Sequence, residues 1–259
     1  MAKEKEPEPV KAEKAQVKDT YEENARGREL TNQLGHSFVA RDYLVSTLVF
    51  GLAYLAYNQF APMKASAVAA GGAVVEPATG FAFDPLLRVD GKELSLLGVG
   101  VRSKLVVSVY AAGFYAEASA MRSATAPLLA LPLHGEPQLF VALAAASAAK
   151  YCVLTFARDV AATKVAEAFL SSPGGSAKSR KELEACIVTQ QGDLKKGDQL
   201  ALSWRGTDGF AVKSGFGTTL CSFRDRPLAE GLLGMYLGKD AVSPKLKASI
   251  ADGIKALHV

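Results

Sequence analysis

The chain has 259 residues, of which 49% are hydrophobic, enough for one sizeable core or for one domain with appendages. Its 30 lysines and arginines against 26 aspartates and glutamates give a formal net charge of +4. The basic residues are spread along the chain with acids between them, which does not indicate a nucleic-acid-binding protein.

Cysteines and histidines are few and widely separated. The three cysteines are Cys152, Cys186 and Cys221, and the three histidines are His36, His134 and His258. This spacing indicates neither a disulfide framework nor a zinc site, and no pair of histidines has the spacing of metal ligands. We therefore expect no dedicated metal site.

Residues 1–41 predict a charged tail. Residues 1–24 are rich in lysine, glutamate and proline and hold almost no large apolar side chains. Such a segment cannot bury enough surface to fold by itself, so we expect it to be disordered or loosely helical. Its many acids argue against an intact mitochondrial or chloroplast transit peptide.

Residues 43–63 form an uncharged apolar run that predicts a transmembrane helix. We assign the transmembrane segment to residues 42–63. At ~1.5 Å rise per residue, about 20 residues span a hydrocarbon core of ~30 Å. Aromatic residues lie toward the ends of the run, where membrane proteins place their aromatic belts. The run is too far from the N-terminus for a cleaved signal peptide. The alternative is a helix buried in a soluble domain.

Charges beside this run indicate its orientation. Arg26, Arg28 and Arg41 precede it, whereas only Lys64 follows closely. The positive-inside rule then places the N-terminus on the cytosolic, matrix or stromal side of the membrane. We expect a protein that crosses the membrane once.

Residues 64–80 are rich in alanine, glycine and valine and predict a linker, and residues 81–259 predict the globular domain. Alternating apolar residues and turn signals predict strands over residues 86–89, 93–97, 105–109, 114–118, 151–156, 199–204, 210–213 and 218–223. The first two form a hairpin that turns at Asp90-Gly91, and another hairpin turns at residues 206–209.

Helices are predicted between and after these strands. Their ranges are 137–149, a segment that starts at Asp159 and stops at Pro173, and then 180–190, 228–237 and 244–257. Strands followed by alternating helices and antiparallel hairpins indicate an α+β fold, with one sheet and helices on one face.

One arginine interrupts an otherwise apolar, strand-like run. Arg102 lies between Leu97 and residues 105–109, with Tyr110 and Tyr115 following. A cation there either reaches out to water or meets an anion inside the fold. Arginine suits the second role, because its planar fork grips a carboxylate with two hydrogen bonds. The other interpretation is a strand whose arginine faces water.

An ordered set of motifs resembles the chalcone isomerase superfamily over residues 85–257. The motifs are Gly98-Val-Gly-Val-Arg102, Val109-Tyr-Ala-Ala-Gly-Phe-Tyr115, Leu154-Thr-Phe-Ala-Arg-Asp159 leading into Val165-Ala-Glu-Ala-Phe169, Lys196-Gly-Asp198, and Tyr236-Leu-Gly-Lys-Asp-Ala-Val-Ser-Pro244. Each is weak alone, and the ordered set is more specific. The resemblance implies an open-faced β-sandwich, an antiparallel sheet packed on helices with a ligand cleft between the two layers.

The superfamily includes isomerases, fatty-acid-binding proteins and other non-catalytic members, so residues must decide the function. In the isomerases an arginine orients the phenolate ketone, and Arg102 matches it. A strand threonine is replaced here by Tyr110, a helix tyrosine by Ala161, an asparagine by Ala168, and a late serine or threonine by Met235. Isomerisation would therefore lack the groups that position water and hold the flavonoid ring.

Similarity to the fatty-acid-binding members implies instead that Arg102 and Tyr110 clamp a carboxylate. Ala161, Ala168 and Met235 then supply apolar surface for an acyl chain. We expect Arg102 to be largely buried and within hydrogen-bond reach of Tyr110 or of a shared anion. The other interpretation is a closed cleft in which Arg102 meets a carboxylate of the protein.

A single span ahead of this domain is similar to fungal members of the mitochondrial inner membrane, which is the favoured location, with a plastid membrane as the alternative. A haem-binding role is associated with some of those members. Haem needs an axial ligand, and the internal candidates Cys152, Cys221 and His134 have no recognisable setting, so we expect no cofactor. Two other functions stay open: an accessory subunit of an organellar membrane complex, and a true chalcone-type isomerase.

Overall fold

The computed structural model describes residues 67–68, 72–129, 136–215 and 217–259. The predicted tail (1–41) and the predicted transmembrane segment (42–63) lie outside these described residues. Within the described ranges, no helix has both the length and the apolar character needed to cross a membrane.

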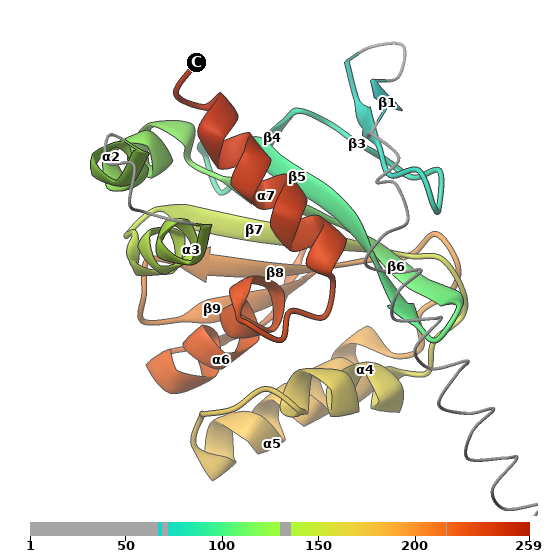
Figure 1. Ribbon diagram of the computed structural model, residues 1–259. Helices are drawn as coiled ribbons and strands as arrows, with labels where there is room; N and C mark the ends of the chain where they lie inside the picture. The colour runs from blue at the N-terminus through green and yellow to red at the C-terminus, as the bar shows by residue number, and fades with distance from the viewer. Residues whose placement is uncertain (1–66, 69–71, 130–135, 216) are drawn as a thin grey trace, which may run out of the picture. The chain divides into compact units, whose positions relative to one another are not determined.

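Seven strands form one antiparallel sheet in which each strand pairs with its neighbours in the sequence (Figure 1). They are β4 (Leu86–Val89), β5 (Lys92–Lys104), β6 (Val107–Ala116), β7 (Ala149–Phe156), β8 (Gln199–Arg205), β9 (Phe210–Ser214) and β10 (Thr219–Phe223). The predicted hairpin at Asp90-Gly91 is confirmed. Both residues have positive φ, 51° and 77°, as a tight two-residue turn requires.

Helices cover one face of this sheet, as predicted (Figure 1). They are α2 (Ala118–Leu129), α3 (Glu136–Ala145), α4 (Ala162–Leu170), α5 (Ala177–Ala185) with the π-helical turn η1 (Cys186–Gln191), α6 (Arg226–Leu237) and α7 (Pro244–Ala256). The main core lies between the two layers. Phe114, Leu154 and Trp204 of the strands pack there with Leu232 and Ile250 of the helices.

The other face of the sheet carries a second, smaller core. The segment before β4 forms a three-stranded antiparallel sheet of β1 (Ala67–Val68), β2 (Val74–Val75) and β3 (Ala82–Phe83). Phe83 joins Tyr115, Tyr151 and Val153 in an apolar cluster, and Val74 packs against it. Residues 64–80, expected to be a linker, therefore contribute two short strands, and Val74 of the second finds apolar partners on the sheet.

The region around residues 105–118 differs from the prediction. Strands were expected over residues 105–109 and 114–118, but β5 continues to Lys104 and a single strand, β6, covers 107–116. The chain turns at Leu105 and Val106, which carry no turn signal. Helix α2 was not predicted, because its alanines and serines give little amphipathic pattern.

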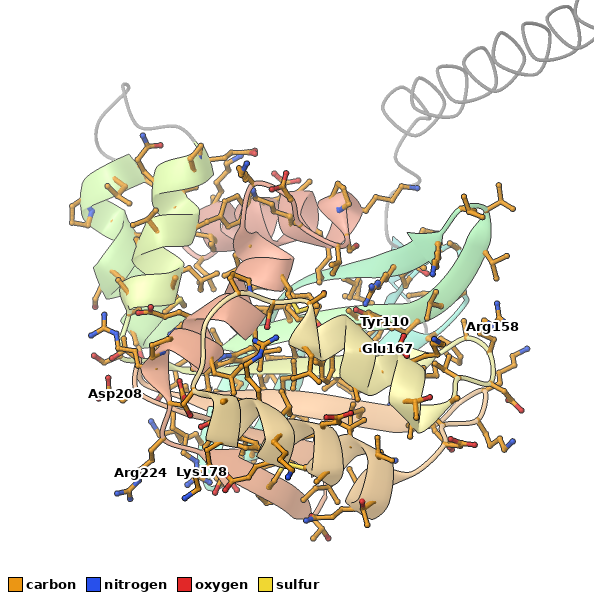
Figure 2. All side chains as sticks on the ribbon, turned by 90° about the horizontal axis from the view of Figure 1, so that it is seen from below. Tyr110, Arg158, Glu167, Lys178, Asp208 and Arg224 are labelled. Atoms are coloured by element: carbon orange, nitrogen blue, oxygen red, sulfur yellow. A yellow bond between two sulfur atoms is a disulfide. The ribbon has the colours of Figure 1, made fainter. Side chains whose placement is uncertain are left out.

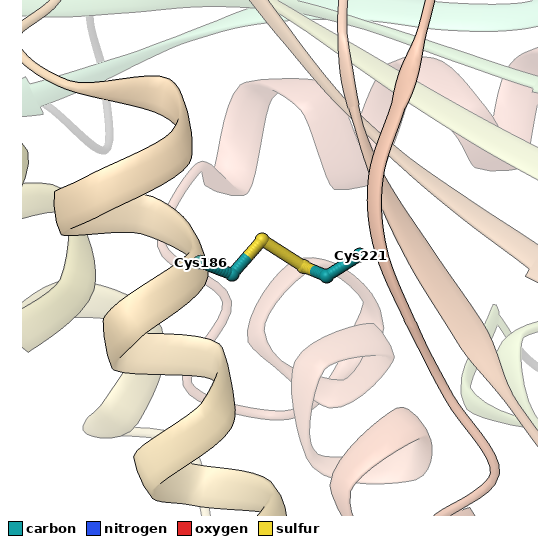
Figure 3. The surroundings of a disulfide bond; sticks show 2 residues. All are labelled: Cys186 and Cys221. Carbon is teal, nitrogen blue, oxygen red and sulfur yellow. A yellow bond between two sulfur atoms is a disulfide. The ribbon is translucent and has the colours of Figure 1, made fainter.

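A disulfide, which the spacing of the cysteines does not predict, joins Cys186 to Cys221 (Figure 3). The two Cα atoms are 6.2 Å apart, and 35 positions separate the residues in the chain. Cys186 opens η1 and Cys221 lies in β10, so the bond ties the helical layer to the edge strand. Spacing alone could not identify one pair among three cysteines. The third, Cys152, is a free thiol buried in β7.

Candidate functional site

Two glycines let helix α7 lie directly against β5. A Cβ on Gly98 would stand 2.5 Å from a backbone nitrogen of α7, and one on Gly100 would overlap the same backbone. Ser243, the N-cap of α7, donates a hydrogen bond of 2.8 Å to the carbonyl oxygen of Val101. The Gly-x-Gly motif therefore fixes β5 against a helix up to the residue before Arg102.

Arg102 and Tyr110 face each other across the β5–β6 hairpin. They are register partners, so their side chains share one face of the sheet. Arg102 Nη1 lies 3.5 Å from the Tyr110 hydroxyl, which confirms the predicted hydrogen-bond reach. The guanidinium carbon lies 5.7 Å from the centroid of the tyrosine ring. Tyr110 is buried, but Arg102 is half-buried where we expected a largely buried side chain, because it borders an open cleft.

Tyr236 continues this pair into the core. Its hydroxyl oxygen lies 3.5 Å from that of Tyr110, and its side chain, from α6, is fully buried. Burial raises the pKa of both tyrosines, so both hydroxyls are neutral at neutral pH and able to donate. The sequence places Tyr236 in the last of the ordered motifs, but it does not reveal the contact of Tyr236 with Tyr110, 126 positions away.

A cleft of 590 Å³ opens beside Arg102 and Tyr110, between the β5–β6 hairpin, the end of β7 and α4. Figure 2 shows Tyr110 next to α4, the helix that carries Glu167. The apolar walls include Val109, Phe156, Val160, Val165 and Phe169. Ala161 and Ala168, which the resemblance matches to an isomerase tyrosine and asparagine, also line this cleft, where they present only methyl groups.

Met235 lies elsewhere. It does not line the cleft beside Arg102, but a neighbouring hollow of 640 Å³ that shares Ser171 with it. Only 8% of Met235 is exposed. The expectation that Met235 adds apolar surface beside an acyl chain at Arg102 is therefore wrong for this cleft, because α6 directs Tyr236 and not Met235 toward Tyr110.

The acids at the cleft are already paired with lysines. Asp159 forms an ion pair of 3.2 Å with Lys195, and Glu167 forms one of 2.8 Å with Lys164. Among the described residues, no carboxylate forms an ion pair with Arg102, whose hydrogen-bond partner is a hydroxyl. The cleft is therefore open, and the described residues do not form the internal Arg102–carboxylate pair of the other interpretation.

Neither cysteine named as a candidate axial ligand for haem is available in the described residues. Cys221 is committed to the disulfide, and Cys152 is fully buried in the core, where burial raises the pKa of its thiol. His134 lies outside the described residues. Over the described ranges, no group of three or more histidines, cysteines or acids is arranged to hold a metal ion.

The cleft thus places the guanidinium of Arg102 and the neutral hydroxyl of Tyr110 beside largely apolar walls. Comparisons with known proteins agree on the fold. The crystal structure of an Arabidopsis thaliana fatty-acid binding protein matches with a TM-score of 0.60 and 23% identity, covering 71% of this chain and 98% of that chain. No curated protein matches significantly. The sequence profile described as chalcone isomerase-like matches residues 76–250, which include the whole sheet, Arg102 and Tyr110. This chain therefore belongs to the chalcone isomerase-like family.

Proposed function

We propose that the protein binds a fatty acid or a similar amphiphilic carboxylate in the cleft beside Arg102 and does not catalyse isomerisation. One observation carries this proposal: a half-buried guanidinium stands at an apolar cleft without an ion pair to any described carboxylate. Withdrawing a cation from water without a counter-ion is unfavourable. A ligand carboxylate offsets that cost, since Arg102 and Tyr110 supply two charge-assisted donors.

The cleft suits the tail of such a ligand. Its volume of 590 Å³ falls within the ~300–1,000 Å³ common for small-molecule sites, and hydrophobic side chains form most of its walls. The Arabidopsis protein with the same fold is described as fatty-acid binding, which supports the same ligand class.

The walls also support a role without catalysis. Proton transfer needs a positioned acid, base or water. Ala161 and Ala168 offer no such group, and Tyr110 is a neutral hydroxyl at neutral pH. We therefore expect no turnover of a chalcone, and measurable turnover would contradict this part of the proposal.

The experiment is a titration of the delipidated full chain with a long-chain fatty acid and with the fatty alcohol of the same length. The acid should bind more tightly, because only its carboxylate meets Arg102. Arg102→Gln removes hydrogen bonds to a charged group, worth about 1.5–3 kcal/mol, and should weaken acid binding by about 10- to 150-fold.

Arg158→Gln is the matched control, because Arg158 is an exposed cation that lines the same cleft. It should change the affinity far less. The proposal is wrong if the alcohol binds as well as the acid, or if Arg102→Gln leaves the affinity of the acid unchanged.

We propose further that residues 42–63 hold the protein in an organellar membrane, with the mitochondrial inner membrane favoured over a plastid membrane. The uncharged length of the run supports this. The positive-inside rule then puts the folded domain on the opposite side from the N-terminus. The disulfide supports an oxidising compartment for that domain.

Alkaline carbonate extraction of membranes tests the tether. The full chain should stay in the membrane pellet, and Leu52→Arg, which places a charge in the middle of the run, should release it. Release of the unaltered chain would contradict the tether. Recovery in a stoichiometric complex after mild detergent extraction would favour an accessory subunit instead.

A further inference from the structure

The β5–β6 hairpin ends in an exposed apolar tip, formed by Leu105, Val106 and Val107. Their exposed fractions are 76%, 83% and 44%. Figure 2 shows this hairpin projecting past the rest of the sheet. Single exposed apolar residues are common on proteins, whereas three consecutive large ones on a projecting turn indicate an interaction surface.

The backbone of the tip supports this interpretation. Leu105 has a φ of 56°, in the left-handed region that glycine or asparagine enters at lower cost. A turn optimised for stability alone would carry one of those residues. Leucine at this position instead places a large apolar side chain at the tip, 76% exposed, despite that backbone cost.

Two cations line the cleft that the tip borders. Lys104 and Arg158 are exposed and line the mouth of the cleft, and among the described residues neither forms an ion pair. The two acids of the same cleft are neutralised by lysines, as described above. The tip and the adjoining cleft therefore combine apolar side chains with two cations that form no ion pair among the described residues.

We propose that this tip docks on a lipid bilayer that contains anionic headgroups. Surface-bound proteins hold to membranes through this combination, in which apolar side chains enter the interface and lysines or arginines meet anionic lipids. The tip is convex and narrow, so it can enter a bilayer without a matching hollow in a partner. Lys104 and Val107 line the cleft as well, so docking turns the mouth of the cleft toward the lipid. The proposal does not depend on which ligand the cleft binds.

The cysteines of the chain permit a direct test. Two of the three form the disulfide and the third is fully buried, so an introduced cysteine is the accessible thiol. Val106→Cys carries an environment-sensitive fluorophore at the tip. Val141→Cys is the matched control, because Val141 is 69% exposed and lies on α3, at the other end of the sheet from the tip (Figure 1).

The labelled full chain is reconstituted in vesicles of phosphatidylcholine, with and without phosphatidylserine, that also contain quencher-labelled lipid. Any other attachment to the membrane is common to both labelled chains, so their difference reports the tip alone. The label at 106 should be quenched and the label at 141 should not. Phosphatidylserine should increase the quenching at 106. Lys104→Gln and Arg158→Gln should each reduce the docked-to-undocked ratio by roughly fivefold.

Equal quenching at the two positions, or none at 106, would overturn the proposal. Quenching at 106 that is the same with and without phosphatidylserine would contradict the role of the cations. Shielding of the label at 106 in lipid-free solution, rising with protein concentration, would show a contact between copies of the chain and would overturn the proposal as well. A separate fatty-acid titration of the Val106→Cys chain measures ligand binding in the cleft. Its result therefore distinguishes failure of the proposed function from failure of docking at the tip.

Discussion

Breaking the bond between Cys186 and Cys221 should lower the free energy of unfolding by about 4 kcal/mol. The bond closes a loop of 35 residues. The chain-entropy relation gives about 4 kcal/mol at 25 °C for a loop of this length, because the cross-link restricts the unfolded chain. At ~2–4 °C per kcal/mol for a domain of this size, the melting temperature should fall by about 8–16 °C.

Urea and thermal denaturation in mild detergent measure this effect on three samples: the oxidised protein, the reduced protein and the double variant Cys186→Ala/Cys221→Ala. The reduced protein and the double variant should agree with each other and lie below the oxidised protein. Cys152 is fully buried and a free thiol in all three samples, so it does not distinguish them. A difference under about 1 kcal/mol between the oxidised and reduced proteins would refute the loop-entropy reasoning.

Four further substitutions test the site and its support. Tyr236→Phe removes the hydroxyl 3.5 Å from that of Tyr110 and should weaken fatty-acid binding by less than about tenfold, as loss of a neutral hydrogen bond does; a larger loss in the titration would show direct contact with the ligand. Gly100→Ala forces a Cβ against the backbone of α7 and should lower the free energy of unfolding in urea by about 1–3 kcal/mol. Gly234→Ala is the control, because nothing lies within 4 Å of the added Cβ, and it should stabilise the fold by up to about 1 kcal/mol. Asp225→Ala removes the cap of α6 and should cost about 1 kcal/mol at pH 7. The carboxylate of Asp225 also accepts a hydrogen bond from the backbone N–H of Ser176, the N-cap of α5, and this bond is the main cause that lowers the pKa of Asp225 from 3.8 to about 2. The stabilisation is therefore present above pH 4. The difference in the free energy of unfolding between the two proteins should shrink as the pH falls toward 2.

Local signals account for most of the elements that the sequence predicted. Asp90-Gly91 supplies the positive φ of a tight hairpin, and the glycines at 206 and 209 mark the next one. Pro173 and the two glycines after it end α4, whose apolar residues recur at helical spacing. These signals act within a few residues, so a single sequence displays them.

The features that escaped prediction depend on distant contacts or on missing local signals. Leu105 gives no sign of a turn, so the sequence was divided into strands at the wrong places. The contact of Tyr236 with Tyr110 spans 126 positions, and the disulfide spans 35. The placement of Met235 outside the cleft depends on which face of α6 meets the sheet, and the motif around Tyr236 does not decide that.

The position of Arg102 on the β5–β6 hairpin connects the two proposed contacts. Toward the base of the hairpin, the glycines of β5 lock the strand on α7, so the backbone up to Val101 is held by a helix. Immediately beyond Arg102 the register of the pair shifts, and such irregularities let a strand bend away from its sheet. Three residues at ~3.3 Å each then separate Arg102 from Leu105, about 10 Å in all. A tip seated in the lipid interface would therefore hold the guanidinium near the headgroup level, where the carboxylate of a membrane-dissolved fatty acid also lies. The fixed base makes this placement a property of the fold, because the hairpin cannot move its arginine without separating β5 from α7.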